Sequence, residues 1–599
     1  MCGIAGIMTK DGSLPADRII DDFAKALEHR GPDGVGRYLL NDLAFVQTRL
    51  AIIDLNTGDQ PFFIENGSDQ TPLALIANGE IYNYLELKQH LTGIAFKTQS
   101  DCEVPLFLYQ SLGIEFAQNL RGMYSIAIHD PAKNRLILSR DPFGIKPLYY
   151  GITEDGFVFS SEFQAFQKAK ILHPKINTEA RDCLLNIQFG AGVETIMEGV
   201  YRVLPGETLV VEKGEITERI QLSALPPVAP AVIKTQDALE KLDAILADSI
   251  DVHQRSDVPY GMFFSGGIDS SVILTMMARL NPEPVQAYTI GFSGTGVHDE
   301  RDHARTVAKT VGSDHHEIEF SEHDFWHTLP AITSLMDDPA ADYAVLPTYK
   351  LAAEVKKAGL KVVLSGEGGD ELFGGYGRYR RAMRHPWLGG RPMRQSGTLE
   401  GLGLLRNEIP QWRTAYDAPA NDLPQSYTRL QKAQAHDCAD WLPNDLLNKL
   451  DRCLMAHGVE GRVPFLDSVV ADFAFGLPDG LKINDGQGKW LLRKWLDQNL
   501  PEAKAFSKKR GFSVPVAEWI LVKAQTLAPL VANQPGIVEA CQPDAVHRLF
   551  ASMDTSADKK RGQAAWHLLY YALWHNHHIC GFASDGDVFD SLNLGKGDS

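Results

Sequence analysis

Two glycine-rich loops about a hundred residues apart carry the residue types best suited to chemistry. The first reads FSGGIDSS at 264–271 and supplies the hydroxyls of Ser265 and Ser270 beside the carboxylate of Asp269. Glycines allow backbone N–H groups to close around phosphate oxygens, and a helix N-terminus favours negative charge. The loop lacks the lysine of a GxxxxGK[ST] loop. We expect a different type of phosphate-binding loop, with a tight turn and helix cap as the weaker alternative.

The second loop reads SGEGGDELFGGY at 365–376 and supplies Glu367 and Asp370. Both loops follow predicted strands, and ligands of open α/β sheets bind at the carboxyl ends of strands. We expect Asp269 and Asp370 to hold one Mg²⁺ ion between them, with Glu367 as a further carboxylate. Helix capping by these acidic residues is the alternative.

The third candidate is Cys2, in the opening MCGIAGI. Removal of Met1 would leave Cys2 with both a thiol and an α-amino group, whose pKa of about 7.7–8.0 suits it to accept the thiol proton. A buried small residue is the alternative, and position 2 alone does not decide between them.

The elements around Cys2 predict an α+β domain. Short β-prone runs such as RLAIIDL and RLILSRD are interrupted by two helical patterns, at about 16–30 and 101–113. Ser100 and Glu103 have the spacing of a capping box for the second helix. Residues 223–235 are rich in proline and alanine and are typical of a linker.

Beyond the linker, strands alternate with helices. We expect strands at 258–264, 286–292, 315–320 and 361–367 and helices at 271–280, 303–312 and 345–359. This alternation predicts a doubly wound parallel sheet. The chain is mostly helical from about 400 onward, and the tail 586–599 is expected to be disordered.

Composition excludes several classes. The net charge is −18, with 58 Lys+Arg and 76 Asp+Glu, which argues against general binding of nucleic acid or of an acidic membrane. No apolar run is long enough for a transmembrane helix, and the N-terminus lacks the basic region of a signal peptide. The seven cysteines are scattered without a CxxC, so we expect a reducing cytoplasm rather than disulfides or zinc. The histidines at 575–578 are interpreted as packing and surface residues.

Eleven stretches together resemble the glutamine-hydrolysing asparagine synthetases across nearly the whole chain. They are MCGIAGI, HRGPDG, QTRLAIIDL, ANGEIYNY, SDCEV, SRDPFGIKPLYY, FFSGGIDSS, YTIGF, LSGEGGDELFGGY, MAHGVEGRVPFLD and KKRGFSVPV. The resemblance implies an N-terminal-nucleophile hydrolase fold of stacked antiparallel sheets with flanking helices. An α/β ATP-pyrophosphatase domain with a helical C-terminal part would follow. We expect the glutaminase domain at 1–210, a linker at 211–235, the synthetase domain at 236–585 and the tail at 586–599.

The resemblance implies that Cys2 is the glutaminase nucleophile. Asn78 and Gly79 would form the oxyanion hole, since a side-chain amide and a backbone N–H are the required donors. Arg49 would hold the α-carboxylate of glutamine. The remaining glutamine contacts are expected from Leu50, Ala51, Ile52, Ile53, Glu80 and Asp101, of which Glu80 and Asp101 would take the α-ammonium group. A plain turn at Asn78-Gly79 and a helix cap at Asp101 are the structural alternatives.

In the synthetase domain the resemblance implies ATP binding by Phe264, Ser265, Gly266, Gly267, Asp269, Ser270, Ile290, Ser365 and Gly366. Glu367 matches a position tied to formation of an acyl-adenylate. Lys509, adjacent to Lys508, matches a lysine placed against the reacting phosphate, whereas an exposed basic patch is the structural alternative. Phe264 replaces a more usual leucine, which would tighten the nucleotide pocket.

The implied reaction is glutamine-dependent synthesis of asparagine from aspartate, with ATP and Mg²⁺. Ammonia released from glutamine would pass along a dry path to a β-aspartyl adenylate, giving asparagine, AMP and pyrophosphate. Tyr343-Ala344 differ from the small hydroxyl residues of many relatives, so a related enzyme that amidates another carboxylate is the main alternative. A non-catalytic glutamine or nucleotide sensor is a third hypothesis. A homodimer is an expectation from the resemblance alone.

Overall fold

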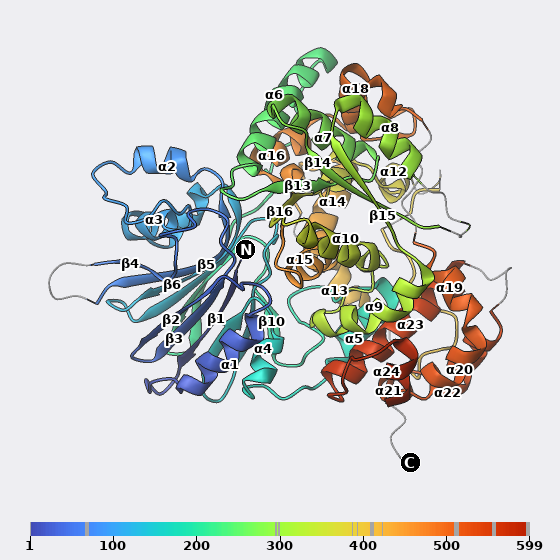
Figure 1. Cartoon of the computed structure of the whole chain (residues 1–599), viewed down its shortest axis with the longest axis horizontal. Helices are drawn as coiled ribbons and strands as arrows, with labels where there is room; N and C mark the ends of the chain where they lie inside the picture. The colour runs from blue at the N-terminus through green and yellow to red at the C-terminus, as the bar shows by residue number, and fades with distance from the viewer. Residues whose placement is uncertain are drawn as a thin grey trace.

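The computed structural model describes residues 2–65, 71–293, 296, 300–385, 387, 389–391, 393–407, 412–421, 423–507, 514–553 and 559–594. Within these residues the chain forms two antiparallel sheets, one parallel sheet and a large helical region (Figure 1). A two-stranded hairpin joins β18 (Ile483–Asn484) to β19 (Gln487–Gly488).

The N-terminal part is a stack of two six-stranded antiparallel sheets, with strand orders β10-β8-β9-β1-β3-β2 and β12-β11-β7-β6-β5-β4. Side chains such as Ile4, Phe45 and Ile76 fill the space between the sheets. The strands are β1 (Gly3–Thr9), β2 (Gly34–Leu40), β3 (Leu43–Arg49), β4 (Phe62–Ile64), β5 (Leu73–Ile81), β6 (Gly122–Asp130), β7 (Arg135–Arg140), β8 (Tyr149–Ile152), β9 (Gly156–Ser160), β10 (Val200–Arg202), β11 (Glu207–Glu212) and β12 (Glu215–Gln221).

Helices flank the stack on both outer faces, as expected. The first sheet is covered by α1 (Asp17–Leu27) and α4 (Gln164–Lys168). The second is covered by α2 (Tyr84–His90), α3 (Val104–Leu112) and η1 (Gly113–Asn119), while α5 (Thr178–Ile187) reaches toward the rest of the molecule. The apolar residues Ile20, Phe23 and Leu27 of α1 have helical spacing and are buried.

Two local expectations were wrong. The capping box does not form, because the Glu103 carboxylate accepts the N–H groups of Lys97 and Thr98, each at 2.9 Å. The hairpin of β11 and β12 extends the second sheet to Gln221, across the expected boundary at 210 and into the expected linker. β12 is an edge strand with mostly exposed, charged residues, so its composition resembles that of a linker.

The parallel sheet has the order β15-β14-β13-β16-β17, and its alternation of strands and helices confirms the doubly wound prediction. Its strands are β13 (Tyr260–Phe263), β14 (Gln286–Gly291), β15 (Asp314–Glu319), β16 (Val362–Leu364) and β17 (Glu460–Arg462). The helices around it include α6 (Thr235–His253), α7 (Ile268–Leu280), α8 (Arg301–Val311), α9 (Glu322–Leu335), α10 (Val345–Lys357) and α11 (Gly369–Phe373). Both glycine-rich loops follow adjacent strands, β13 and β16, and therefore open at the same edge of the sheet.

The helical region confirms the expectation for the C-terminal part. It contains α12 (Gly377–Met383), α13 (Trp412–Asp417), η3 (Ala418–Ala420), α14 (Arg429–His436), η4 (Asp437–Leu447), α15 (Asn448–Met455), η5 (Pro464–Leu466), α16 (Ser468–Gly476), α17 (Asp479–Lys482), α18 (Trp490–Asn499), η6 (Pro501–Ala503), α19 (Val516–Val522), α20 (Ala524–Ala532), α21 (Pro535–Ala540), α22 (Pro543–Ala551), α23 (Lys559–His578) and α24 (Val588–Leu594). The prediction of disorder was wrong for 588–594, because Val588 and Leu592 are buried against neighbouring helices. Within the described part of the chain, no helix has the length and apolar character needed to cross a membrane.

Candidate active sites

The thiol of Cys2 lies in an enclosed site at the start of β1, with the residue 7% exposed. Its backbone N–H donates to Asn78 Oδ1 at 3.0 Å, and its carbonyl accepts a hydrogen bond from Arg30 Nε at 3.2 Å. Burial raises the pKa of the thiol, while the guanidinium of Arg49 acts in the opposite direction. The thiol therefore needs a nearby base to become a nucleophile.

Asn78 presents a free donor beside Cys2. Because Oδ1 accepts the Cys2 N–H, the amide nitrogen Nδ2 is turned away from it. Nδ2 is buried, and none of the described residues accepts a hydrogen bond from it. An unsatisfied buried donor costs about 1–3 kcal/mol, so its retention beside a candidate nucleophile fits an oxyanion hole.

Gly79 follows on the same strand, β5, where the chain leaves no room for a side chain. A Cβ at this position would lie 2.1 Å from the carbonyl oxygen of Met123 and 2.6 Å from the Cα of Tyr124. Any other residue would displace β5 from β6. The plain turn considered for Asn78-Gly79 is therefore wrong, since both residues belong to a paired strand.

Charges of both signs gather around the thiol. Arg49 ends β3, where its Nη1 donates to Asp59 Oδ1 at 2.7 Å and its Nη2 to the Asp54 carbonyl at 2.5 Å. Glu80 and Asp101 are buried, and burial raises the pKa of both carboxyls. Asp101 does not cap α3, because its Oδ2 accepts the Ile81 N–H at 2.7 Å.

The four residues after Arg49 line the boundary between the two parts of the chain. Leu50 and Ile52 are buried against Val362 and Met455 of the second part. Ala51 is buried, and Ile53 is half-buried. The segment expected to contact glutamine is thus also held by the parallel-sheet domain.

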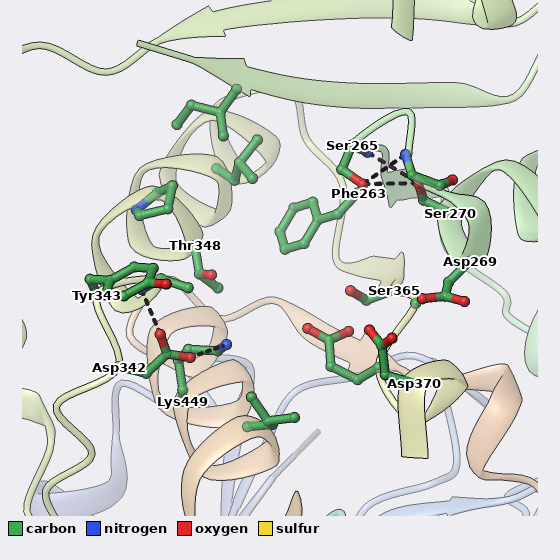
Figure 2. A pocket seen from close by; sticks show the side chains of 18 of the residues that line it. Phe263, Ser265, Asp269, Ser270, Asp342, Tyr343, Thr348, Ser365, Asp370 and Lys449 are labelled. Atoms are coloured by element: carbon green, nitrogen blue, oxygen red, sulfur yellow. Dashed lines mark hydrogen bonds and ion pairs between the residues drawn. The ribbon is translucent and has the colours of Figure 1, made fainter. Parts of the chain in front are cut away.

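A cavity of about 500 Å³ opens where β13, β14 and β16 end (Figure 2). The structure brings together here ten of the sequence-predicted residues: Phe264, Ser265, Gly267, Asp269, Ser270, Ile290, Ser365, Gly366, Glu367 and Asp370. Gly266 makes the turn behind them, with a φ of +73° that favours glycine.

The first glycine-rich loop is held in shape by its own hydroxyls. Ser265 Oγ and Ser270 Oγ lie 3.1 Å apart, and the Gly267 N–H donates to Ser265 Oγ at 3.2 Å. Phe264 turns into the core and is 2% exposed, whereas the ring of Phe263 points into the cavity (Figure 2). Phe263, which no sequence motif singled out as a site residue, is therefore the aromatic side chain of this segment that enters the cavity.

Lys489 is a second residue that the sequence did not reveal. Its Nζ forms ion pairs with Asp269 and with Asp370, the latter at 2.7 Å. Burial lowers the pKa of this lysine, but the two carboxylates outweigh that effect and raise it. The only sequence signal is the turn DGQGK, which places Lys489 in a left-handed conformation directly before α18.

Asp269 and Asp370 fit a Mg²⁺ ion that is shared with bound phosphates. Mg²⁺ is commonly held by one or two carboxylates together with substrate phosphates. No group of three His, Cys, Asp or Glu side chains able to hold a metal occurs in the described part of the chain. Two carboxylates whose charge is partly balanced by Lys489 suit an ion that also takes ligands from bound phosphates.

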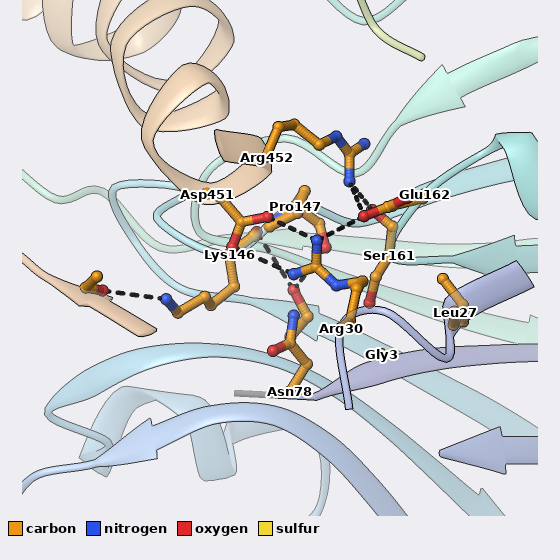
Figure 3. A network of polar contacts seen from close by, with 12 residues as sticks. Gly3, Leu27, Arg30, Asn78, Lys146, Pro147, Ser161, Glu162, Asp451 and Arg452 are labelled. Carbon is orange, nitrogen blue, oxygen red and sulfur yellow. Dashed lines mark hydrogen bonds and ion pairs between the residues drawn. The ribbon is translucent and has the colours of Figure 1, made fainter. Parts of the chain in front are cut away.

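A layer of buried charges lies next to the thiol site (Figure 3). Arg30, which holds the Cys2 carbonyl, also donates to Glu162 Oε1 and Asp451 Oδ2, both at 2.8 Å. Arg452 contacts Glu162 at 3.0 Å and Asp337 at 2.7 Å. These ion pairs join the N-terminal sheets to α15 of the second part.

The wall of the cavity opposite the loops carries Asp342 and Lys449, whose Oδ2 and Nζ are 2.9 Å apart (Figure 2). Neither was singled out from the sequence, although Asp342 directly precedes Tyr343-Ala344. Lys509 and its neighbour Lys508 lie outside the described residues.

Comparisons with known proteins agree with this two-site arrangement. Residues 241–576 match the family model described as asparagine synthase, and residues 1–221 match the one described as glutamine amidotransferase domain. The chain is 33% identical over 630 residues to "Asparagine synthetase [glutamine-hydrolyzing] 1" of Bacillus subtilis (strain 168), covering 97% of each protein. It is 28% identical to "Asparagine synthetase B [glutamine-hydrolyzing]" of Escherichia coli (strain K12), covering 89% of this chain and 86% of that protein.

Proposed function

Because the chain belongs to the family of glutamine-hydrolysing asparagine synthetases, we propose that it makes asparagine from L-aspartate, with glutamine as nitrogen donor and ATP as energy source. The observation that carries this proposal is the unpartnered Asn78 Nδ2 beside Cys2, in the same molecule as the phosphate-loop cavity. One site is suited to amide hydrolysis and the other to activation of a carboxylate.

In the first reaction, removal of Met1 frees the α-amino group of Cys2, which takes the thiol proton. The thiolate attacks the amide carbon of glutamine, and Asn78 Nδ2 with the Gly79 N–H stabilises the oxyanion. The C–N bond then breaks, ammonia leaves with the proton, and water hydrolyses the thioester to glutamate. Arg49 binds the α-carboxylate of glutamine, while Glu80 and Asp101 bind its α-ammonium group.

In the second reaction, the β-carboxylate of aspartate attacks the α-phosphorus of ATP and pyrophosphate leaves. Ammonia then attacks the acyl carbon and AMP leaves. The loop at 264–270 holds the phosphates, Ile290 lines the adenine site, and Glu367 acts on the reacting groups, a role that the family resemblance also gives to Lys509. Asp269 and Asp370 would hold Mg²⁺, which when bound neutralises phosphate charge.

Two further properties are part of this proposal. The free state of the cysteines supports a reducing, cytoplasmic location. The homodimer expected from the family stays a prediction, which light scattering of the purified chain would check.

The variant Cys2→Ala tests the division of labour. We expect loss of all glutamine-dependent synthesis, with synthesis from added ammonium kept within about threefold of wild type, because the second cavity does not contain Cys2. Asparagine and AMP would be measured with each nitrogen source. Cys183→Ala, at another buried cysteine, should keep both activities. If Cys2→Ala removed both activities, the proposal of two separable sites would be wrong.

A further inference from the structure

The wall around Lys449 is assembled from three separate segments, because η4 continues directly into α15. Asp342 lies just before α10, Asp445 lies in η4, and Lys449 lies in the first turn of α15. Gln188, from the end of α5 in the N-terminal part, completes the wall. η4 is an 11-residue π-helix, a rare conformation that often occurs at functional sites.

The charges of this wall are buried and nearly balanced. Asp342 and Lys449 are 9% and 5% exposed, and they form an ion pair with each other. Gln188 Nε2 donates to Asp445 Oδ2 at 2.8 Å, and Asp445 Oδ1 has no hydrogen-bond partner in the described residues. Burial, with the charge of Asp342, raises the pKa of Asp445 to about 8, so this carboxyl is neutral at pH 7.

Burying this ion pair costs desolvation free energy, which is best explained if the pair binds a ligand. Desolvation of two buried charges commonly cancels their attraction, so such a pair is poor evidence for a purely stabilising role. The pair also faces the cavity instead of packed apolar side chains. Glu367 raises the pKa of Lys449 through its charge, which places the expected adenylation carboxylate near this wall.

We propose that Lys449 binds the α-carboxylate and Asp342 the α-ammonium group of the acceptor amino acid, which assigns this wall as the acceptor-specificity site. When the acceptor binds, its α-carboxylate and α-ammonium group replace Asp342 and Lys449 as each other's partners. Because these two groups carry opposite charges, binding them adds no net charge to the wall. Its side-chain carboxylate then extends past Glu367 toward the phosphate loop. The inference rests on the proposed function and identifies which acceptors that function can use.

Acceptors that lack one of the two groups should be rejected. Succinate is aspartate without the α-ammonium group, and β-alanine is aspartate without the α-carboxylate. Each would leave one buried charge uncompensated. A polar site commonly rejects such an analogue by about 10²-fold or more.

The test is an acceptor–variant cycle, measured as acceptor-dependent exchange of labelled pyrophosphate into ATP. In wild type we expect kcat/KM for aspartate to exceed that for succinate and β-alanine by about 10²-fold or more. In Lys449→Met, kcat/KM for aspartate should fall to the value for β-alanine, because β-alanine lacks the group that Lys449 binds. The value for β-alanine itself should change little. In Asp342→Asn, kcat/KM for aspartate should fall to the value for succinate.

Controls separate a binding role from a structural one. Lys350→Met removes another ion-paired lysine, on the neighbouring α10, and should leave the discrimination intact. The double variant Lys449→Met, Asp342→Asn leaves no orphaned charge and should treat the three acids alike. Retained glutamine hydrolysis reports that each variant is folded.

An equal loss for all three acids, or unchanged discrimination in the single variants, would overturn the inference alone. Absence of aspartate-dependent exchange in wild type would overturn the proposed function, and the inference with it.

Discussion

At the residue scale, the main feature of the thiol site is a donor kept without a partner. Asn78 Nδ2 is positioned by the bond between Oδ1 and the Cys2 N–H, so the two functional groups orient each other. The protein retains this unsatisfied group on a fully buried side chain of β5.

Asn78→Ala tests the oxyanion hole directly. We expect kcat for glutamine hydrolysis to fall by about 10²–10³-fold, the usual effect of removing one such donor. Synthesis from ammonium should be unchanged. Asn83→Ala, just beyond the same strand, should have little effect on either activity. A fall below threefold for Asn78→Ala would exclude it from the oxyanion hole.

Lys482 provides a test of charge burial away from both sites. It is fully buried, its Nζ donates to the Phe475 carbonyl at 2.8 Å, and burial lowers its pKa to about 7. Between about pH 7 and pH 10 the unfolded chain holds a proton on this lysine that the folded chain lacks. Stability due to this group therefore rises with pH, by up to about 1.4 kcal/mol per pH unit.

We expect the variant Lys482→Met to lack this rise of stability with pH. The melting temperature of wild type relative to the variant should increase between pH 7 and pH 9.5, when both are measured by scanning calorimetry. Lys309→Met, on the exposed face of α8, should show no such trend. A constant difference across that range would show that Lys482 titrates normally.

Sequence patterns predicted some of these residues and not others, for identifiable reasons. Cys2 and the two glycine-rich loops carry their chemistry in adjacent residues, so motifs reveal them. Lys449, in α15, and Lys489, directly before α18, are single lysines, and only tertiary packing brings them to the cavity wall and to the cavity's carboxylates. Their burial and their carboxylate partners are visible only in the folded chain.

At the element scale, α15 links the two sites. Lys449, at the start of α15, faces the cavity. Asp451 and Arg452, within the next turn of the helix, belong to the layer of buried charges next to Cys2. The alternation of strands and helices predicted the parallel sheet well. β12 was missed because an exposed edge strand has the composition of a linker, and α24 because only its buried Val588 and Leu592 distinguish it from a disordered tail.

Arg30→Met tests the link between the N-terminal sheets and α15. Removing this guanidinium leaves the buried carboxylates of Glu162 and Asp451 with less compensation, which we expect to destabilise the protein by about 3–5 kcal/mol. Thermal unfolding would measure the loss. Arg279→Met breaks the half-exposed pair with Asp243 and should change stability little. Equal effects of the two variants would contradict the role given to the charge layer.

At the scale of the whole molecule, the two candidate sites lie on either side of a buried interface and share elements across it. The segment after Arg49 packs on the parallel-sheet domain. Gln188, from the N-terminal part, lines the cavity of that same domain. This close packing of the two parts supports transfer of ammonia inside the protein, where bulk water cannot protonate it. Separate domains on a flexible tether would not provide such a path.

The most direct measurement is the fate of the amide nitrogen of glutamine. The enzyme would be given amide-¹⁵N glutamine, L-aspartate, ATP and Mg²⁺ together with unlabelled ammonium, and the products analysed by mass spectrometry. We predict ¹⁵N-asparagine, enriched well above the label in free ammonium, with one AMP and one pyrophosphate for each asparagine. Glutamate release without labelled asparagine, or formation of ADP and phosphate in place of AMP and pyrophosphate, would contradict the proposed reaction.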